Sequence, residues 1–167
     1  MAEALFITAA DLKRNTIING SVDADLFMQY IRISQTIHIT HYLGTDLYNR
    51  LQAGIIAADL TTVEDTLIQD YIQDALIHLA MAEYLPFASV KVSNGGVFKH
   101  IPDNAESVES EEIDRLAQKE KDYADYYLKR LLDYLKFNQS LYPQYTTNTD
   151  EDIKPSSIID YTGGWVL

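Results

Sequence analysis

The chain contains no cysteine, so neither a disulfide framework nor a thiolate zinc site can form. Basic residues are also few: 13 lysines and arginines stand against 25 aspartates and glutamates, which gives a net charge of −12. This balance argues against a nucleic-acid-binding protein and against binding to an anionic membrane, because both depend on lysine and arginine. The absence of cysteine fits a reducing cytosol.

Long apolar runs are missing, because nowhere do about 18 apolar residues follow one another. The first residues, MAEALFITAADLKRNT, have no basic leader before an apolar segment and no small-residue cleavage pattern. We therefore expect a protein that is not exported and does not act at a membrane.

Catalytic signatures are absent as well. The sequence has no Gly-x-Ser-x-Gly elbow and no glycine-rich phosphate loop followed by lysine. His38, His41 and His78 could form a loose set of metal ligands, but a helical di-metal site needs Glu-x-x-His on two helices. The sequence lacks that pattern. We expect no enzymatic activity, no metal and no cofactor.

Helical periodicity dominates the rest of the chain, which has 167 residues and is 47% hydrophobic. Apolar residues recur at helical spacing between caps, glycines and prolines. This pattern predicts helices over residues 8–14 and 23–44, a helix that starts at Thr45, a helix from Thr62 to Leu85, and a helix that starts at Ser110. The cap of the fourth helix is expected at Thr62, with Asp65 three residues later. The isoleucines at 31, 33, 37 and 39 also permit a strand. The prediction is an all-α bundle of four to five helices over residues 1–142.

One stretch, VKVSNGGVFKH at residues 90–100, departs from this pattern. Its flanks are β-branched or aromatic, and the Asn-Gly-Gly between them tolerates the positive φ of a tight turn. A short β-hairpin is predicted at about 90–99. An isolated two-stranded hairpin is only marginally stable in water, so it must lean on a helix or on another chain. The candidate interface residues here are Val92, Asn94, Gly95, Gly96, Val97 and Phe98.

The helical period stops at Pro143, and residues 143–167 are predicted to form an extended C-terminal arm. A disordered tail would be poor in large apolar residues, whereas this one ends in a cluster of them. We therefore expect the arm to dock, either as a strap across its own bundle or on a neighbouring subunit. The candidate interface residues in the arm are Tyr161, Trp165 and Leu167.

Tyrosine is abundant, with 12 residues, and four of them crowd the last long helix. They are Tyr123, Tyr126, Tyr127 and Tyr134. Tyrosine is enriched at protein–protein contacts, although the inside of a thick bundle would hold the same residues. Both interpretations indicate assembly rather than catalysis.

The order of elements is more specific than any single motif. A short helix with Asp11-Leu12-Lys13 and an acidic turn, Asp23-Ala24-Asp25-Leu26, lead into a long helix that ends at Tyr42-Leu43-Gly44. This order resembles the head–tail connector (adaptor or head-completion) proteins of tailed bacteriophages. The next helix, the hairpin and the tyrosine-bearing helix look like the variant in phages or prophages of the Bacteroidetes group. The resemblance covers most of residues 5–140.

What the resemblance implies is a structural virion protein. Such a protein forms a ring of about twelve copies, with the portal above and the tail or a second connector protein below. It would reside in the host cytoplasm before assembly. DNA would pass as a non-specific passenger, repelled by carboxylates facing the lumen, and the hairpin would be completed by a neighbour or the portal. The alternatives are a small cytosolic helical protein-binding module or regulator and, third, a metal-dependent enzyme.

Overall fold

The computed structural model describes residues 3–18, 21–88, 90–93, 96–99, 109–149 and 152–159. Most of these residues are helical, so the predicted all-α class is confirmed. Five of the candidate interface residues lie outside the described residues: Asn94, Gly95, Tyr161, Trp165 and Leu167.

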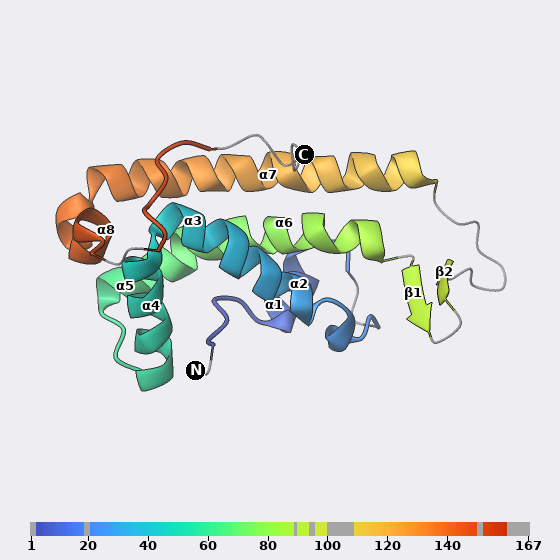
Figure 1. Cartoon of the computed structure of the whole chain (residues 1–167), viewed down its shortest axis with the longest axis horizontal. Coiled ribbons are helices and arrows are strands. Elements are labelled where there is room, and N and C mark those ends of the chain that lie inside the picture. Colours follow the sequence, from blue (N-terminus) through green and yellow to red (C-terminus); the bar gives the residue numbers. More distant parts are fainter. Residues whose placement is uncertain are drawn as a thin grey trace.

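Figure 1 shows the elements in chain order. The first half contains α1 (Ala9–Asn15), the 3-10 turn η1 (Ala24–Leu26), α2 (Met28–Ser34), the π-helical turn η2 (Gln35–Ile39), α3 (Thr40–Leu43) and α4 (Thr45–Ala57). The centre contains α5 (Thr62–Leu67), the π-helical turn η3 (Ile68–Ile72), α6 (Gln73–Tyr84) and the 3-10 turn η4 (Leu85–Phe87). The remaining elements are β1 (Val90–Ser93), β2 (Gly96–Lys99), α7 (Ser110–Phe137), η5 (Gln139–Leu141) and α8 (Pro143–Thr147).

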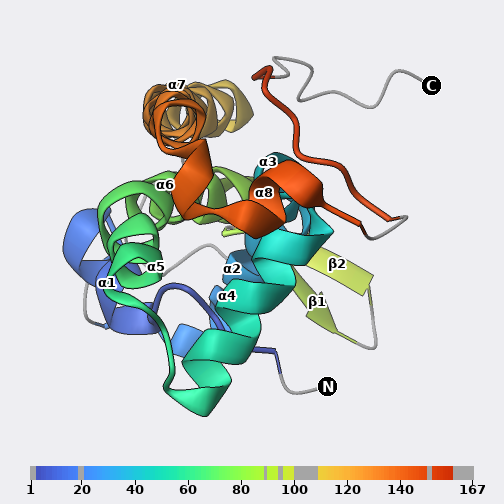
Figure 2. The same cartoon turned by 90° about the vertical axis from the view of Figure 1, so that its left-hand side faces the viewer.

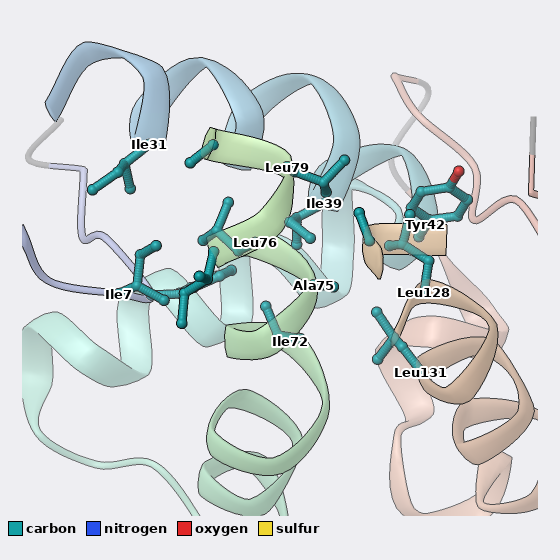
Figure 3. Packing of buried hydrophobic residues seen from close by; sticks show 14 of the residues in the cluster. Ile7, Ile31, Ile39, Tyr42, Ile72, Ala75, Leu76, Leu79, Leu128 and Leu131 are labelled. Carbon is teal, nitrogen blue, oxygen red and sulfur yellow. The ribbon is translucent and has the colours of Figure 1, made fainter. Parts of the chain in front are cut away.

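The central element is α6, which contacts α7 along one side and α2 along the other (Figure 1). Its side chains are buried nearly all round, as expected for a helix between two others. The long helix α7 is amphipathic and buries Ala117, Ala124, Leu128 and Leu131 at helical spacing. Figure 3 shows core side chains of α2, α6 and α7 gathered around α6.

Two helix starts illustrate how far local caps could be predicted. Thr8 and Asp11 form the capping box of α1, which confirms the expected start of the first helix. The cap predicted at Thr62 was wrong by one residue. Thr61 has the extended backbone of an N-cap, and the side chain of Glu64 accepts the Thr61 N–H at 2.8 Å. Glu64, not Asp65, is therefore the acid of this capping box.

The chain after α7 also differs from the prediction. Residues 143–147 were expected to be extended but form α8, which begins with Pro143 at the first helical position, where proline is favoured. Tyr142 just before it is buried. Its hydroxyl donates to the carbonyl of Val63 at 3.1 Å, so the helical core continues beyond residue 142.

We expect Tyr142→Phe to lower the free energy of unfolding by about 1 kcal/mol, because the carbonyl of Val63 loses a partly buried hydrogen bond. Burial, together with the Tyr134 hydroxyl, raises the pKa of Tyr142, so the phenol remains a neutral donor. Urea denaturation measures the change. The control is Tyr126→Phe on the 66% exposed Tyr126, which should leave stability unchanged. Equal stabilities of the two variants would contradict the assignment.

Candidate interaction surfaces

The two strands form a small antiparallel sheet at one end of the molecule. Their register pairs Val90 with Lys99, Lys91 with Phe98, Val92 with Val97, and Ser93 with Gly96. The sheet lies beyond the end of α6, where β1 contacts η4 (Figure 1). Four predicted interface residues therefore lie together on this sheet: Val92, Gly96, Val97 and Phe98.

A cluster of aromatic side chains lies at the base of the sheet. The ring of Phe87 stacks on Tyr30 with centroids 5.7 Å apart, and Tyr30 in turn meets Tyr84 edge-on at 5.6 Å. Phe87 is nevertheless 54% exposed, and the neighbouring Val90 is exposed as well. We call Tyr30, Ile33, Phe87 and Val90 the apolar end patch, since Ile33 lies one turn after Tyr30 and is also exposed.

Sequence reasoning missed this patch. The available signal was Phe87 directly after Pro86, because an aromatic residue that follows the proline stop of a buried helix lies where the chain leaves the core. That position alone does not reveal Tyr30 as its neighbour, which is contributed by α2.

The tyrosines of α7 divide into two groups. Tyr134 stacks on Tyr71 with centroids 3.9 Å apart, and Tyr127 stacks on His78 at 5.5 Å. These pairs form an aromatic seam that joins α7 to η3 and α6. Tyr123 and Tyr126 remain exposed. Of the two interpretations of the tyrosine-rich helix, internal packing therefore applies to the first group. Tyr123 also lies beside His78, with centroids 5.3 Å apart, so exposure alone distinguishes the second group.

Two of the three histidines considered as metal ligands, His38 and His78, lie beside different carboxylates. His78 Nδ1 lies 2.6 Å from Glu120 Oε2 of α7, and His38 Nε2 lies 3.2 Å from Glu83 Oε1 of α6. The hydrogen bond from His38 lowers the pKa of Glu83, although burial opposes it. Within the described ranges, no group of three or more histidine, aspartate and glutamate side chains could hold a metal ion.

Beyond α8, the described part of the predicted C-terminal arm is residues 152–159, and it lies on its own chain. Thr45 N–H donates to the carbonyl of Ile153 at 2.9 Å, and Ser156 N–H donates to the carbonyl of His41 at 3.0 Å. We call residues 152–159 the strap. Figure 2 shows it running from the region of α8 and α4 toward α7. Of the two alternatives for the arm, this part is a strap on its own bundle.

Comparison with known protein families adds one finding. Residues 39–154 match DUF6712, described as a family of unknown function. The chain belongs to the DUF6712 family. No curated protein and no solved structure matches it.

The DUF6712 match begins at the last residue of η2, covers the elements from α3 to α8 and reaches the start of the strap. The aromatic seam, the sheet and the contact of Ile153 with Thr45 therefore lie inside the family region. The N-terminal segment, α1 and α2 lie outside it. Among the helices that the structure describes, none is long and apolar enough to cross a membrane.

Proposed function

We propose that this DUF6712 protein is a structural protein of a tailed-phage virion that forms a ring between portal and tail, through which DNA passes. It acts without catalysis and without a cofactor. The order of helices that motivates the resemblance is retained: α1, the acidic turn η1, a helical run from Met28 that ends at Gly44, and the helices around the sheet.

The observation that supports this proposal most is the sheet at the end of the molecule. A hairpin of two short strands is marginally stable alone, and within the described chain each strand pairs only with the other. The apolar end patch lies beside it, with Phe87 and Val90 exposed. Open strand edges next to apolar side chains suit a neighbouring subunit or the portal, which would add backbone hydrogen bonds and cover the patch.

The charge of the chain supports the same function. Its net charge of −12 is unfavourable for a protein that grips DNA. A conduit has the opposite requirement, because carboxylates along a lumen repel phosphates and let DNA slide. A small protein-binding module is the second candidate, since the apolar end patch could serve one partner as well. The two differ in copy number: the module binds as a single copy, the connector as a ring.

The test compares Phe87→Lys with Ile56→Lys. Both side chains are about equally exposed, 54% and 58%, but Ile56 lies on α4, away from the sheet. Both variants should fold, with unchanged far-ultraviolet circular dichroism. Native mass spectrometry and electron microscopy, with the portal protein encoded beside this chain, should show rings for the wild type and Ile56→Lys. Phe87→Lys should form none, because a buried ammonium group is not tolerated in an apolar interface.

The proposal fails if the wild type stays monomeric in the presence of the portal protein. It also fails if no portal gene lies near the gene for this chain. If both lysine variants form rings equally well, the apolar end patch is not part of the interface.

A further inference from the structure

The outward side of α7 carries a second set of large side chains, separate from the buried one. Its members recur at alternating steps of three and four residues along the helix, which is the heptad spacing at which helices pair. Every member is exposed, and Phe137 is exposed by 88%. We call this set the outer stripe, and it comprises Leu116, Lys119, Tyr123, Tyr126, Arg130, Asp133 and Phe137.

The outer stripe is partly ordered by contacts within its own chain. Lys119 Nζ lies 5.1 Å from the centroid of the Tyr123 ring, and that ring lies beside His78. The guanidinium of Arg130 lies over the Tyr71 ring at 4.5 Å and donates to a main-chain carbonyl of η3 at 2.8 Å. These side chains are therefore exposed and also held in position, which lowers the entropic cost of binding a partner.

The spacing of the outer stripe determines the kind of partner. Side chains at heptad positions fit between the side chains of a second helix that runs along them for several turns. Figures 1 and 2 show α7 along one edge of the molecule, where such a helix can reach it. The α7 helix of a second copy has the required length, 28 residues, and offers the same stripe.

Charge disfavours a parallel pair of α7 helices. In a parallel pair each heptad position meets its own copy, so Lys119 would face Lys119, Arg130 would face Arg130, and Asp133 would face Asp133. Like charges placed directly against each other in a contact are unfavourable. The antiparallel direction avoids all three of these contacts.

An antiparallel pair has a register in which the charges are complementary. In this register both cations face aromatic rings, which attract them, and the remaining tyrosine faces the carboxylate, to which its hydroxyl can donate. The pairs across the contact are Lys119 with Phe137, Arg130 with Tyr126, and Tyr123 with Asp133. Two-fold symmetry repeats each pair. A shift by one heptad would instead place Lys119 against Arg130, which is unfavourable.

The residues beside the outer stripe agree with this register. Asp122 comes next to Lys136 of the second copy, and these charges are opposite. Lys129 comes next to its own copy at the two-fold axis, but its ammonium group is paired with Asp133 at 2.9 Å, which offsets part of the repulsion. The shifted register would place Arg115 next to Lys136, two like charges.

We propose that the outer stripe pairs antiparallel with the outer stripe of a second copy, so that the free protein is a symmetric dimer. A contact of this kind uses the same surface on both copies and closes on itself, so it joins two copies and does not build a ring. It also differs from the apolar end patch, which is formed by residues of α2, η4 and β1. The dimer therefore goes beyond the proposed function and does not depend on it.

The sign of the charge at Tyr126 tests both the dimer and its register. Tyr126→Lys and Tyr126→Glu remove the same exposed ring, but in the proposed register lysine meets Arg130 of the second copy, whereas glutamate pairs with it. Sedimentation equilibrium and native mass spectrometry of the full-length chain, without the portal protein, measure dissociation. The wild type should be a dimer, and Tyr126→Lys should dissociate about tenfold more readily than Tyr126→Glu. The control is Ile56→Lys on α4, which should dimerise as the wild type does.

The absence of cysteine allows a second test by cross-linking. In the proposed register Lys129 lies close to its own copy, whereas Gln118 lies about 30 Å from its copy along the helix pair. Both side chains are exposed. A short bismaleimide should therefore link Lys129→Cys into a covalent dimer about tenfold more efficiently than Gln118→Cys.

Three results would overturn the inference: a monomeric wild type, equal dissociation of Tyr126→Lys and Tyr126→Glu, or equal linking of the two cysteine variants. None of them bears on the ring, which is measured with the portal protein present. Conversely, a dimer that behaves as expected in a protein that forms no ring with the portal would support this inference while the proposed function fails.

Discussion

Gly44→Ala should lower the free energy of unfolding by about 3 kcal/mol. Gly44 joins α3 to α4 with φ 75° and ψ 160°, a region that is essentially restricted to glycine. A Cβ at this position would lie 2.6 Å from Cδ and Cγ of Pro155 and 2.8 Å from Oδ1 of Asn148. The alanine variant therefore combines backbone strain with displacement of the strap.

Gly54→Ala is the matched control. A Cβ at Gly54 would approach Cδ2 of Leu60 at 2.5 Å, but this atom is the far end of a flexible side chain that can turn aside. Gly54 lies inside α4, where alanine is favoured over glycine by about 0.5–1 kcal/mol. The two effects oppose each other, so stability should change by less than about 1 kcal/mol.

Urea denaturation compares the two variants with the wild type. Hydrogen exchange adds a local readout, because the amide of Ser156 donates to the carbonyl of His41 and should lose protection in Gly44→Ala. Equal stability of the two alanine variants, or an unchanged Ser156 amide, would show that the strap does not depend on Gly44.

The helix boundaries could largely be predicted, because their signals are local. The capping box of Thr8 and Asp11, the glycine at 44 and the proline at 86 each act within one turn of the helix that they bound. The error at Thr61 has the same origin. Two consecutive threonines, each followed three residues later by an acid, give two equivalent caps in the sequence, and the folded chain uses the one whose acid meets Arg50.

The π-helical turns η2 and η3 could not be predicted. Each adds a residue to a helical turn and so rotates the buried face. Both turns contain residues that are buried in the core, Gln35 and Ile39 in η2 and Ile68 and Ile72 in η3. η2 begins at Gln35, whose partners are Ala4 and Phe6. A periodic pattern cannot reveal a polar core residue that is paired with a segment about 30 residues away.

The candidate interaction surfaces also divide into a part that the local sequence predicts and a part that depends on tertiary contacts. The position of Val92, Val97 and Phe98 in short strands follows from β-branched and aromatic residues around a turn sequence. The apolar end patch depends on tertiary structure, because Phe87 finds Tyr30 only when α2 packs against α6. The role of these residues in assembly stays a prediction, as does that of Trp165, which lies outside the described residues.

Arg50 holds three parts of the chain together. Its guanidinium binds both carboxylate oxygens of Glu64 at 2.7 and 2.9 Å and a carboxylate oxygen of Asp59 at 2.9 Å. It thereby connects α4 with the loop that follows and with the start of α5. Bidentate pairs of this kind are among the stronger charged hydrogen bonds.

Arg50→Met should lower the free energy of unfolding by about 3 kcal/mol at neutral pH, because the buried carboxylate of Glu64 would lose its counterion. The control is Arg32→Met. Arg32 pairs with Glu3 at 2.9 Å but is 65% exposed, and exposed ion pairs contribute at most about 1 kcal/mol. Equal losses in the two variants would show that the Arg50 network is no more than a surface ion pair.

The pH dependence separates the charge of this network from its packing. Burial raises the pKa of Glu64, but the hydrogen bonds from Arg50 and Thr61 outweigh it and hold the pKa below its usual value. A carboxyl with a lowered pKa stabilises the fold above its usual pKa of about 4.3, and this contribution is lost as the pH falls through the lower folded value. The stability gap between wild type and Arg50→Met, measured by urea denaturation, should therefore narrow from pH 7 toward pH 3. A gap that stays constant over this range would assign the loss to the packing of the arginine stem against Glu64 and Asp59, and not to its charge.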